Sequence, residues 1–174
     1  AEGKEYSINC RKPAGEETKY EECTGEEEVM LDQNELAEGH DYFAVGGMGV
    51  SDDNRILAFG VDTVSRRQYN VHFKDLQTGE MLPDMIPVTT GGATWAADNK
   101  TVFYTRKDEQ TLRSNQVYRH VLGTPVEDDR QPAPDARPGE VFEAARPARV
   151  EREFAEMKAA AIARGDGGPH AGAR

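Results

Sequence analysis

The sequence predicts a mainly β protein: a partial β-propeller of about two four-stranded blades, followed by a C-terminal tail that is helical or disordered. Three observations predict this fold class. Short apolar segments of strand length alternate with turn signals from Phe43 onward. The same pattern starts again 45 residues later, where Gly91 takes the place of Gly46. After Val126 the composition changes abruptly to Pro, Ala and Arg, which is not typical of strands.

The N-terminal part combines short strands with polar segments. Residues 5–11 alternate polar and apolar side chains and predict a strand, and residues 28–32 (EVMLD) predict a second one. Between them, residues 13–28 combine Pro13 and two glycines with many carboxylates, which favours a solvated loop. An acidic metal-binding loop is a remote alternative, because the D-x-D-x-D-G ligand pattern is missing. Residues 33–40 predict a turn or a single helical turn.

Four segments in sequence predict the first blade. They are separated by the turn-rich sequences SDDN, TVSRR and LQTGE. The last segment has its prolines at the margins, as expected of an edge strand. The predicted strands cover residues 43–51, 55–62, 68–75 and 81–87.

An internal repeat predicts the second blade. GGMGVSDDNRILAF, at residues 46–59, aligns with GGATWAADNKTVFY, at residues 91–104. After a short insertion Tyr69 aligns with Tyr118, and no convincing last strand follows in the second copy. A repeat of about 40 to 50 residues built only from strands is the signature of a propeller blade. The coinciding pairs are Gly46/Gly91, Gly47/Gly92, Asp53/Asp98, Asn54/Asn99, Val50/Trp95, Leu57/Val102 and Phe59/Tyr104.

These patterns divide the chain into three parts. We expect residues 1–127 to form the partial propeller and residues 128–147, which include DRQPAPDARP, to form a Pro-rich linker. Residues 148–174 predict a single helix and a disordered end, because apolar side chains recur at roughly helical spacing before Gly165. The sequence has no initiator Met and opens in a strand-like segment, so we expect a fragment of a longer protein.

Composition and charge argue against several classes of function. The net charge is −11 and the isoelectric point is about 4.8, so phosphate backbones and anionic membranes would repel the chain, and we expect neither as a partner. No segment approaches the roughly 20 apolar residues of a membrane span, which predicts a soluble protein of the cytoplasm or the periplasm. Cys10 and Cys23 could form a disulfide or stay free; two cysteines are too few for a disulfide scaffold, which favours free thiols.

Four segments carry a close resemblance to a known family: SRRQY (65–69), FKDLQTGE (73–80), TWAADNKTVFYTRKD (94–108) and QVYRHVLGT (116–124). Over about residues 1–127 the sequence resembles the N-terminal propeller of oligopeptidase B-like members of the prolyl oligopeptidase family of serine peptidases. The resemblance ends where family members continue with a further strand, whereas here VEDDR runs into the tail rich in Pro and Ala.

The resemblance implies a fold and an activity. Such proteins pair a seven-bladed propeller with an α/β-hydrolase domain that bears a Ser, Asp and His triad, and they cut short peptides after Arg or Lys. Their propeller covers the active site, so that only short and flexible chains reach it. This chain would then be part of the substrate-gating, non-catalytic propeller, and peptide substrates would be partners only through the missing catalytic domain.

The residues themselves predict no catalytic, cofactor-binding or metal-binding site. No G-x-S-x-G nucleophile elbow occurs, so the chain alone is expected to be inactive. His72 and His120 lie in predicted strands and are interpreted as hydrogen-bonded structural residues. The glycines of VGGMGV lie in a strand instead of opening a helix, which favours close strand packing over a phosphate-binding loop. Trp95 is interpreted as a core or inter-blade residue.

Arg66 and Arg67 are the candidate contact residues, with two interpretations. They are solvated loop cations or pair with a local carboxylate such as Asp62. Alternatively, one guanidinium bridges the propeller to a carboxylate of the missing hydrolase domain, which the resemblance supports. A different class of function is a stand-alone interaction module that self-associates through exposed blade faces, since two blades cannot close a ring.

Overall fold

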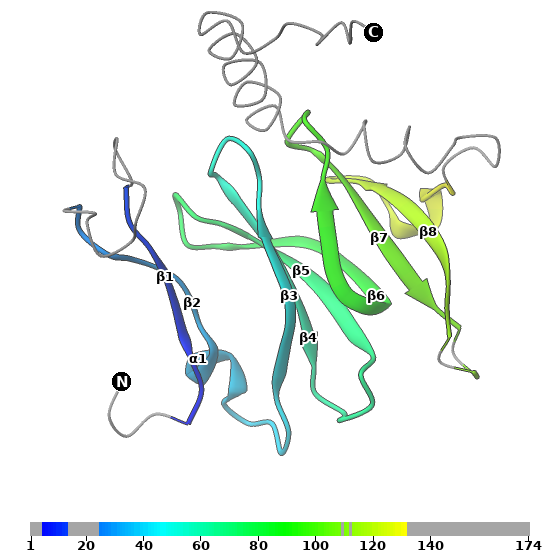
Figure 1. Ribbon diagram of the computed structural model, residues 1–174, viewed down its shortest axis with the longest axis horizontal. Coiled ribbons are helices and arrows are strands. Elements are labelled where there is room, and N and C mark those ends of the chain that lie inside the picture. Colours follow the sequence, from blue (N-terminus) through cyan, green and yellow to red (C-terminus); the bar gives the residue numbers. More distant parts are fainter. Residues whose placement is uncertain (1–4, 14–24, 109, 112, 132–174) are drawn as a thin grey trace, which may run out of the picture.

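The structure is a computed structural model of the 174-residue chain, and it describes residues 5–13, 25–108, 110–111 and 113–131. This described part consists mainly of antiparallel strands (Figure 1). The prediction of a mainly β, partial propeller is confirmed. The linker beyond residue 131, the predicted helix and disordered end, and most of the acidic loop fall outside the described residues.

The first blade contains all four predicted strands. Each strand pairs antiparallel with the next one in sequence. The turn predicted from LQTGE follows the third strand, because the Asp75 carboxylate accepts hydrogen bonds from the backbone N–H groups of Gln77 and Thr78. The strands are β3 (Ala44–Val50), β4 (Ile56–Asp62), β5 (Tyr69–Asp75) and β6 (Met81–Trp95).

The strand β6 is longer than the segment predicted at residues 81–87, because it belongs to both blades. Its first part, up to Thr89, pairs with β5 of the first blade. Its last part pairs with β7 (Thr101–Lys107) of the second blade. Positive backbone φ angles at Val88 (55°) and Gly91 (98°) redirect the chain within the strand. One strand therefore links the two blades without a loop.

The second blade is built from the end of β6, from β7 and from β8 (Ser114–Val121). The chain then forms a short 3-10 turn, η2 (Val126–Asp128). Beyond it, the backbone of Arg130 exchanges two hydrogen bonds with that of Arg119, at 2.9 and 3.4 Å. Within the described residues this single bridge stands where a fourth strand would pair, which agrees with the predicted lack of a convincing last strand.

The turns that connect the first two strands of each blade repeat each other. Asn54 and Asn99 have backbone φ angles of 59° and 57°, a left-handed conformation that asparagine tolerates better than most residues. The two turns also touch, since the Asn99 side chain accepts a hydrogen bond of 3.1 Å from the Asp53 backbone N–H. The alignment of the two Asp-Asn pairs in the sequence is confirmed.

The strand register corrects one of the predicted equivalences. In the first blade Phe59 lies opposite His72, and in the second blade Tyr104 lies opposite Tyr118. Tyr118 is therefore the equivalent of His72, and its predicted equivalence to Tyr69 is wrong. The insertion in the second blade is a bulge within the pairing of β7 and β8, which the match of two tyrosines in the sequence did not reveal.

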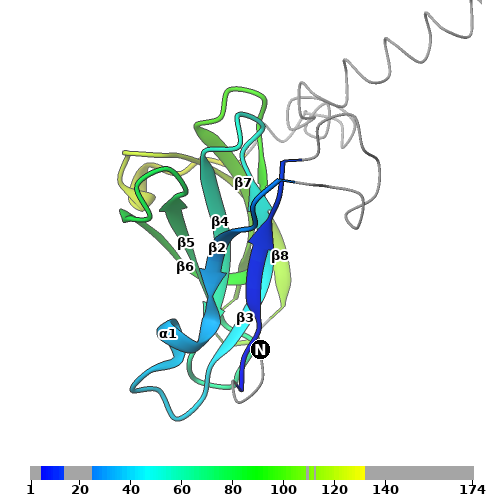
Figure 2. The ribbon, with the colours of Figure 1, turned by 90° about the vertical axis from the view of Figure 1, so that its left-hand side faces the viewer.

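A separate hairpin lies beside the first blade (Figures 1 and 2). It consists of β1 (Ile8–Arg11) and β2 (Glu28–Asp32), so the strand predicted at 5–11 begins three residues later. The Arg11 guanidinium donates a hydrogen bond of 2.6 Å to the backbone carbonyl of Asn54. This contact ties the hairpin to the first turn of the blade.

A single helical turn follows the hairpin, as predicted for residues 33–40. The helix α1 (Gln33–Ala37) starts where the Asp32 carboxylate accepts a 2.9 Å hydrogen bond from the backbone N–H of Asn34. Asparagine and aspartate at this position satisfy N–H groups that a helix leaves without partners. The cap fixes the direction in which the chain leaves the hairpin toward β3.

The first blade has two apolar faces, because side chains alternate along each strand. One face, here called the packed face, lies against the second blade. Its side chains share one buried cluster with those of Trp95, Val102 and Tyr104. The packed face consists of Ala58, Val71, Phe73 and Ile86, each at most 1% exposed.

The opposite face, here called the open face, is covered only in part. Leu31 of β2 packs there against Leu57 and Phe59 of β4. Directly opposite residues on neighbouring strands share a face, which adds methionines from β3 and β6 to this side. The exposed fractions of Met48, Met81 and Met85 are 42%, 44% and 41%.

Candidate functional site

The turn between β4 and β5 holds both predicted contact residues. Its anchor is Asp62, the last residue of β4, which is 1% exposed. The Asp62 carboxylate accepts hydrogen bonds from the backbone N–H groups of Val64, at 2.9 Å, and Arg67, at 2.7 Å. Both carboxylate oxygens are thus occupied by backbone donors. Among the described residues no arginine of this turn forms an ion pair with Asp62, so of the two local interpretations the structure shows the solvated cations.

The backbone of this turn is held in an unusual conformation. Ser65 and Arg67 have positive φ angles of 59° and 54°, which non-glycine residues seldom adopt. The Lys107 ammonium, from β7, donates a hydrogen bond to the backbone carbonyl of Arg67. A buried carboxylate and a lysine of the second blade therefore fix the turn from two sides, and such over-determined strain is often found at functional sites.

The arginine side chains of this turn are open to solvent. Arg66 and Arg67 are both exposed. Among the described residues neither guanidinium has an ion pair. The side chain of Val64 beside them is 58% exposed. The turn thus presents two cations and one apolar side chain on a rigid backbone.

The paired glycines allow the inner strands of the two blades to approach each other closely. A Cβ atom on Gly47 would lie 2.9 Å from the Cα atom of Gly92. A Cβ atom on Gly60 would lie 2.2 Å from the carbonyl oxygen of Gly91, closer than any side chain tolerates. The interpretation of these glycines as close packing is confirmed, and they lie in strands where a phosphate-binding loop would need a helix.

Trp95 contributes to the same contact between the blades. Its indole N–H donates a hydrogen bond of 2.9 Å to the backbone carbonyl of Gly49 in β3. Its ring lies at 6.0 Å from that of Phe73 and is 5% exposed. The interpretation of Trp95 as an inter-blade residue is confirmed.

The two strand histidines differ in their surroundings. His120 is completely buried, and both ring nitrogens lie within hydrogen-bond distance of carboxylate oxygens. His72 is half-buried beside Phe59, with ring centroids 6.0 Å apart. Burial lowers the pKa of His72 below its usual value. The interpretation as a hydrogen-bonded structural residue is therefore confirmed for His120, whereas His72 lines a pocket.

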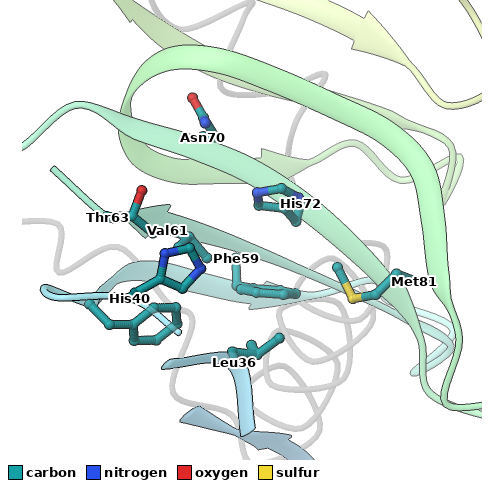
Figure 3. Close-up of a pocket in the computed structure, with 9 residues that line it drawn as sticks. Leu36, His40, Phe59, Val61, Thr63, Asn70, His72 and Met81 are labelled. Atoms are coloured by element: carbon teal, nitrogen blue, oxygen red, sulfur yellow. The ribbon is translucent and has the colours of Figure 1, made fainter. Parts of the chain in front are cut away.

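This pocket, of about 320 Å³, lies on the open face and was not found from the sequence. Figure 3 shows the side chains of α1, of the segment before β3 and of β4 and β5 around it. Its lining contains no serine, cysteine or lysine, and its polar side chains are those of Thr63, Asn70 and two histidines. The lining residues are Leu36, His40, Phe43, Phe59, Val61, Thr63, Asn70, His72 and Met81.

Comparison with known protein families establishes the family to which this chain belongs. Residues 1–142 match the family described as prolyl oligopeptidase, N-terminal beta-propeller domain. The chain belongs to the prolyl oligopeptidase family. This match confirms the resemblance carried by SRRQY and the three other segments. The part of the family's fold that is present here is the N-terminal propeller.

Individual members of the prolyl oligopeptidase family are similar to this chain over about three quarters of its length. Dipeptidyl aminopeptidase BI of Pseudoxanthomonas mexicana is 42% identical and covers 73% of the chain. Protease 2 of Moraxella lacunata is 38% identical and covers 72% of it. Oligopeptidase B from Leishmania major has a similar structure, with a TM-score of 0.66, 33% identity and 74% of the chain covered.

The chain spans less than a fifth of the length of these relatives, namely 19%, 18% and 18%. In the part of the chain that the structure describes, no helix is long and apolar enough to cross a membrane. No group of three potential metal ligands occurs among those residues either. Cys10 is a free and half-buried thiol, as favoured from the sequence, while Cys23 falls outside the described residues.

Proposed function

We propose that this chain is part of the non-catalytic, substrate-gating propeller of a serine oligopeptidase that cleaves short peptides after basic residues. The match of residues 1–142 to the propeller domain of a peptidase family is the observation that carries this proposal. The close contacts of Gly46, Gly47 and Gly60 with Gly91 and Gly92 are here called the glycine seam. Two blades joined by this seam suit a wall that excludes folded substrates, because backbones packed this closely leave little room for deformation. The compartment, cytoplasm or periplasm, stays a prediction.

Arg66 and Arg67 are proposed as the contact between this propeller segment and the hydrolase domain. Their rigid, anchored turn favours this role, since a guanidinium held on a fixed backbone loses less entropy when it binds a carboxylate. An exposed loop cation without a partner would need neither the buried Asp62 carboxylate nor two positive φ angles.

The 174-residue chain and the complete reading frame of its gene together test this function. The substrates are short peptides that carry Arg or Lys directly before a fluorogenic reporter group. The protein encoded by the complete reading frame should hydrolyse them, and the 174-residue chain should not. Turnover by the chain alone that a serine-reactive inhibitor abolishes would contradict the proposal. Release of dipeptides from free N-termini, in place of internal cleavage after basic residues, would replace the proposed specificity while keeping the propeller assignment.

A second candidate function is a self-associating module, favoured by the three exposed methionines of the open face. Sedimentation of the chain should then show a defined oligomer that Met85→Lys disrupts, with Val64→Lys, an exposed change outside that face, as its control. A monomer at all concentrations, or an equal effect of both variants, would rule it out.

A further inference from the structure

Three ionisable side chains from three segments meet in the interior where the two blades join. Asp84 comes from the part of β6 that pairs within the first blade, His120 from β8, and Asp129 follows η2. The distance from His120 Nδ1 to Asp129 Oδ1 is 2.8 Å, and from His120 Nε2 to Asp84 Oδ1 it is 3.2 Å. The exposed fractions of the three side chains are 8%, 0% and 2% in chain order. None of them has a role in the proposed function.

The two contacts define the protonation state of the ring. An ionised carboxylate can only accept hydrogen bonds, and a neutral imidazole has only one N–H to donate. Because both nitrogens of His120 face carboxylate oxygens, both must carry a proton if Asp84 and Asp129 are ionised. The ring is then an imidazolium cation between two carboxylates, an arrangement that strengthens both hydrogen bonds.

Neutral donors satisfy the carboxylates further. The Tyr104 hydroxyl donates a 2.7 Å hydrogen bond to Asp129 Oδ2, and the backbone N–H of Gly123 donates one of 2.6 Å to Asp84 Oδ1. Burial and the neighbouring Asp129 raise the pKa of Tyr104 above its usual range, so its hydroxyl keeps its proton.

The other groups around the ring complete the electrostatic environment. Arg106 of β7 lies 3.2 Å from the Tyr104 hydroxyl and supplies the second nearby cation. From β5, the uncharged ring of Phe73 stacks on His120, with centroids 6.1 Å apart. The Arg130 guanidinium also lies close, 3.3 Å from the backbone carbonyl of Asp129. The cluster therefore holds one imidazolium and two carboxylates, with two guanidinium groups at its edge.

The cluster joins parts of the chain that are remote in sequence. Asp84 is 36 residues from His120 and belongs to the outer part of the first blade. Asp129 directly precedes Arg130, whose backbone pairs with Arg119 on β8. We propose that His120, as an imidazolium held by Asp84 and Asp129, is a protonation-dependent lock that fastens the second blade and the segment 126–130 to the first blade.

The lock depends on the positive charge of the ring. A ring with a single N–H would leave a bare nitrogen facing a carboxylate oxygen, and would remove the charge that lies between the two buried carboxylates.

Nitrogen NMR of the imidazole rings in the 174-residue chain tests the protonation state directly. The His120 signals are assigned by their loss in His120→Gln. Both ring nitrogens should carry protons at neutral pH, with a direct coupling to hydrogen visible for each. A His120 ring with a single N–H would mean a neutral imidazole beside a protonated carboxyl group, and would overturn the proposal.

Amide hydrogen exchange tests the lock itself. The amides of Arg119 and Arg130 form the bridge, and His120→Gln and Asp129→Asn should each accelerate their exchange by about tenfold or more. Glu127→Gln is the matched control: it removes the same charge from an exposed residue nearby and should leave the exchange unchanged.

The amide of Val71 in the first blade distinguishes release of segment 126–130 from global unfolding. Global unfolding accelerates hydrogen exchange at Val71 too, whereas local release of the segment does not. Equal exchange at Arg119 and Arg130 in His120→Gln and Glu127→Gln would overturn the lock. A variant that unfolds completely leaves the decision to the NMR of the unchanged chain.

Discussion

The two faces of the first blade are both apolar and have very different surroundings. Each presents a large aromatic side chain, Phe73 of β5 on the packed face and Phe59 of β4 on the open face. On the packed face every member is at most 1% exposed, because the second blade covers it. On the open face the hairpin covers Phe59 and leaves three methionines more than 40% exposed.

This difference teaches that burial in a propeller blade is set by the neighbour and not by the strand. An alternating apolar pattern guarantees that a face can be buried, while the seam of glycines decides how closely the next blade can approach. Substitutions on the packed face should therefore cost far more stability than comparable ones on the open face.

The largest expected effect is the loss of a packed aromatic ring. Phe73→Ala should lower the free energy of unfolding by about 3 to 5 kcal/mol, because Phe73 is 0% exposed and contacts rings of the second blade. Met85→Ala on the open face should cost less than about 1 kcal/mol. Urea unfolding followed by circular dichroism measures both, and similar losses would refute the distinction between the faces.

The glycine seam should respond to a single methyl group. Gly60→Ala places its Cβ 2.2 Å from the Gly91 carbonyl oxygen and should cost about 3 kcal/mol. In Gly92→Ala the nearest atom is 4.0 Å from the new Cβ, so the cost should stay near the 1 kcal/mol scale or below. If Gly60→Ala proves as stable as Gly92→Ala in the same urea experiment, the close approach of the two blades is wrong.

A smaller effect concerns one hydrogen bond across the packed side. Trp95→Phe removes the donor to the Gly49 carbonyl and part of the buried indole while keeping an aromatic ring, and should cost about 1 to 2 kcal/mol in thermal or urea unfolding. Tyr118→Phe, which removes a hydroxyl bonded to the exposed Gln116, should change stability by a few tenths of a kcal/mol. A larger loss in Tyr118→Phe than in Trp95→Phe would contradict this ranking.

The smallest effect concerns His72 on the open face. Because burial lowers its pKa below 6.5, the folded state binds fewer protons than the unfolded state as the pH falls through this value. The contribution of His72 is therefore fully present above pH 6.5 and is lost toward acid. Unfolding midpoints at about pH 7.5 and about pH 5.5 should differ less in His72→Gln than in the unchanged chain. An identical difference in both would show that the pocket does not desolvate this ring.

Repeated local patterns made much of the fold predictable. Asn54 and Asn99 occupy the same left-handed turn position because both blades need it, and the sequence shows this directly. The continuity of β6 could not be predicted, since the positive φ angles at Val88 and Gly91 depend on pairing with two different strands. The predicted equivalence of Tyr118 to Tyr69 was wrong because the bulge between β7 and β8 leaves no mark in the amino-acid composition.

The candidate site was predictable only as residue types. The exposure of Arg66 and Arg67 follows from a polar turn, but the anchoring of that turn by Lys107 joins residues 40 positions apart. One partner of His120 is also remote in sequence, since Asp84 lies 36 residues away. The pocket beside His72 needs Leu36 of the short helix to lie near side chains of β4 and β5, which no local pattern encodes.

The unbroken β6 has a consequence for how the blades can be separated. Its residues Met81–Trp95 pass from one blade to the next while pairing on both sides of the junction, so no exposed loop tip exists there for a protease to enter or for an inserted segment to occupy. A recombination event that exchanged one blade would have to cut inside a hydrogen-bonded strand. Cleavage at the junction would therefore first require local unfolding of both blades.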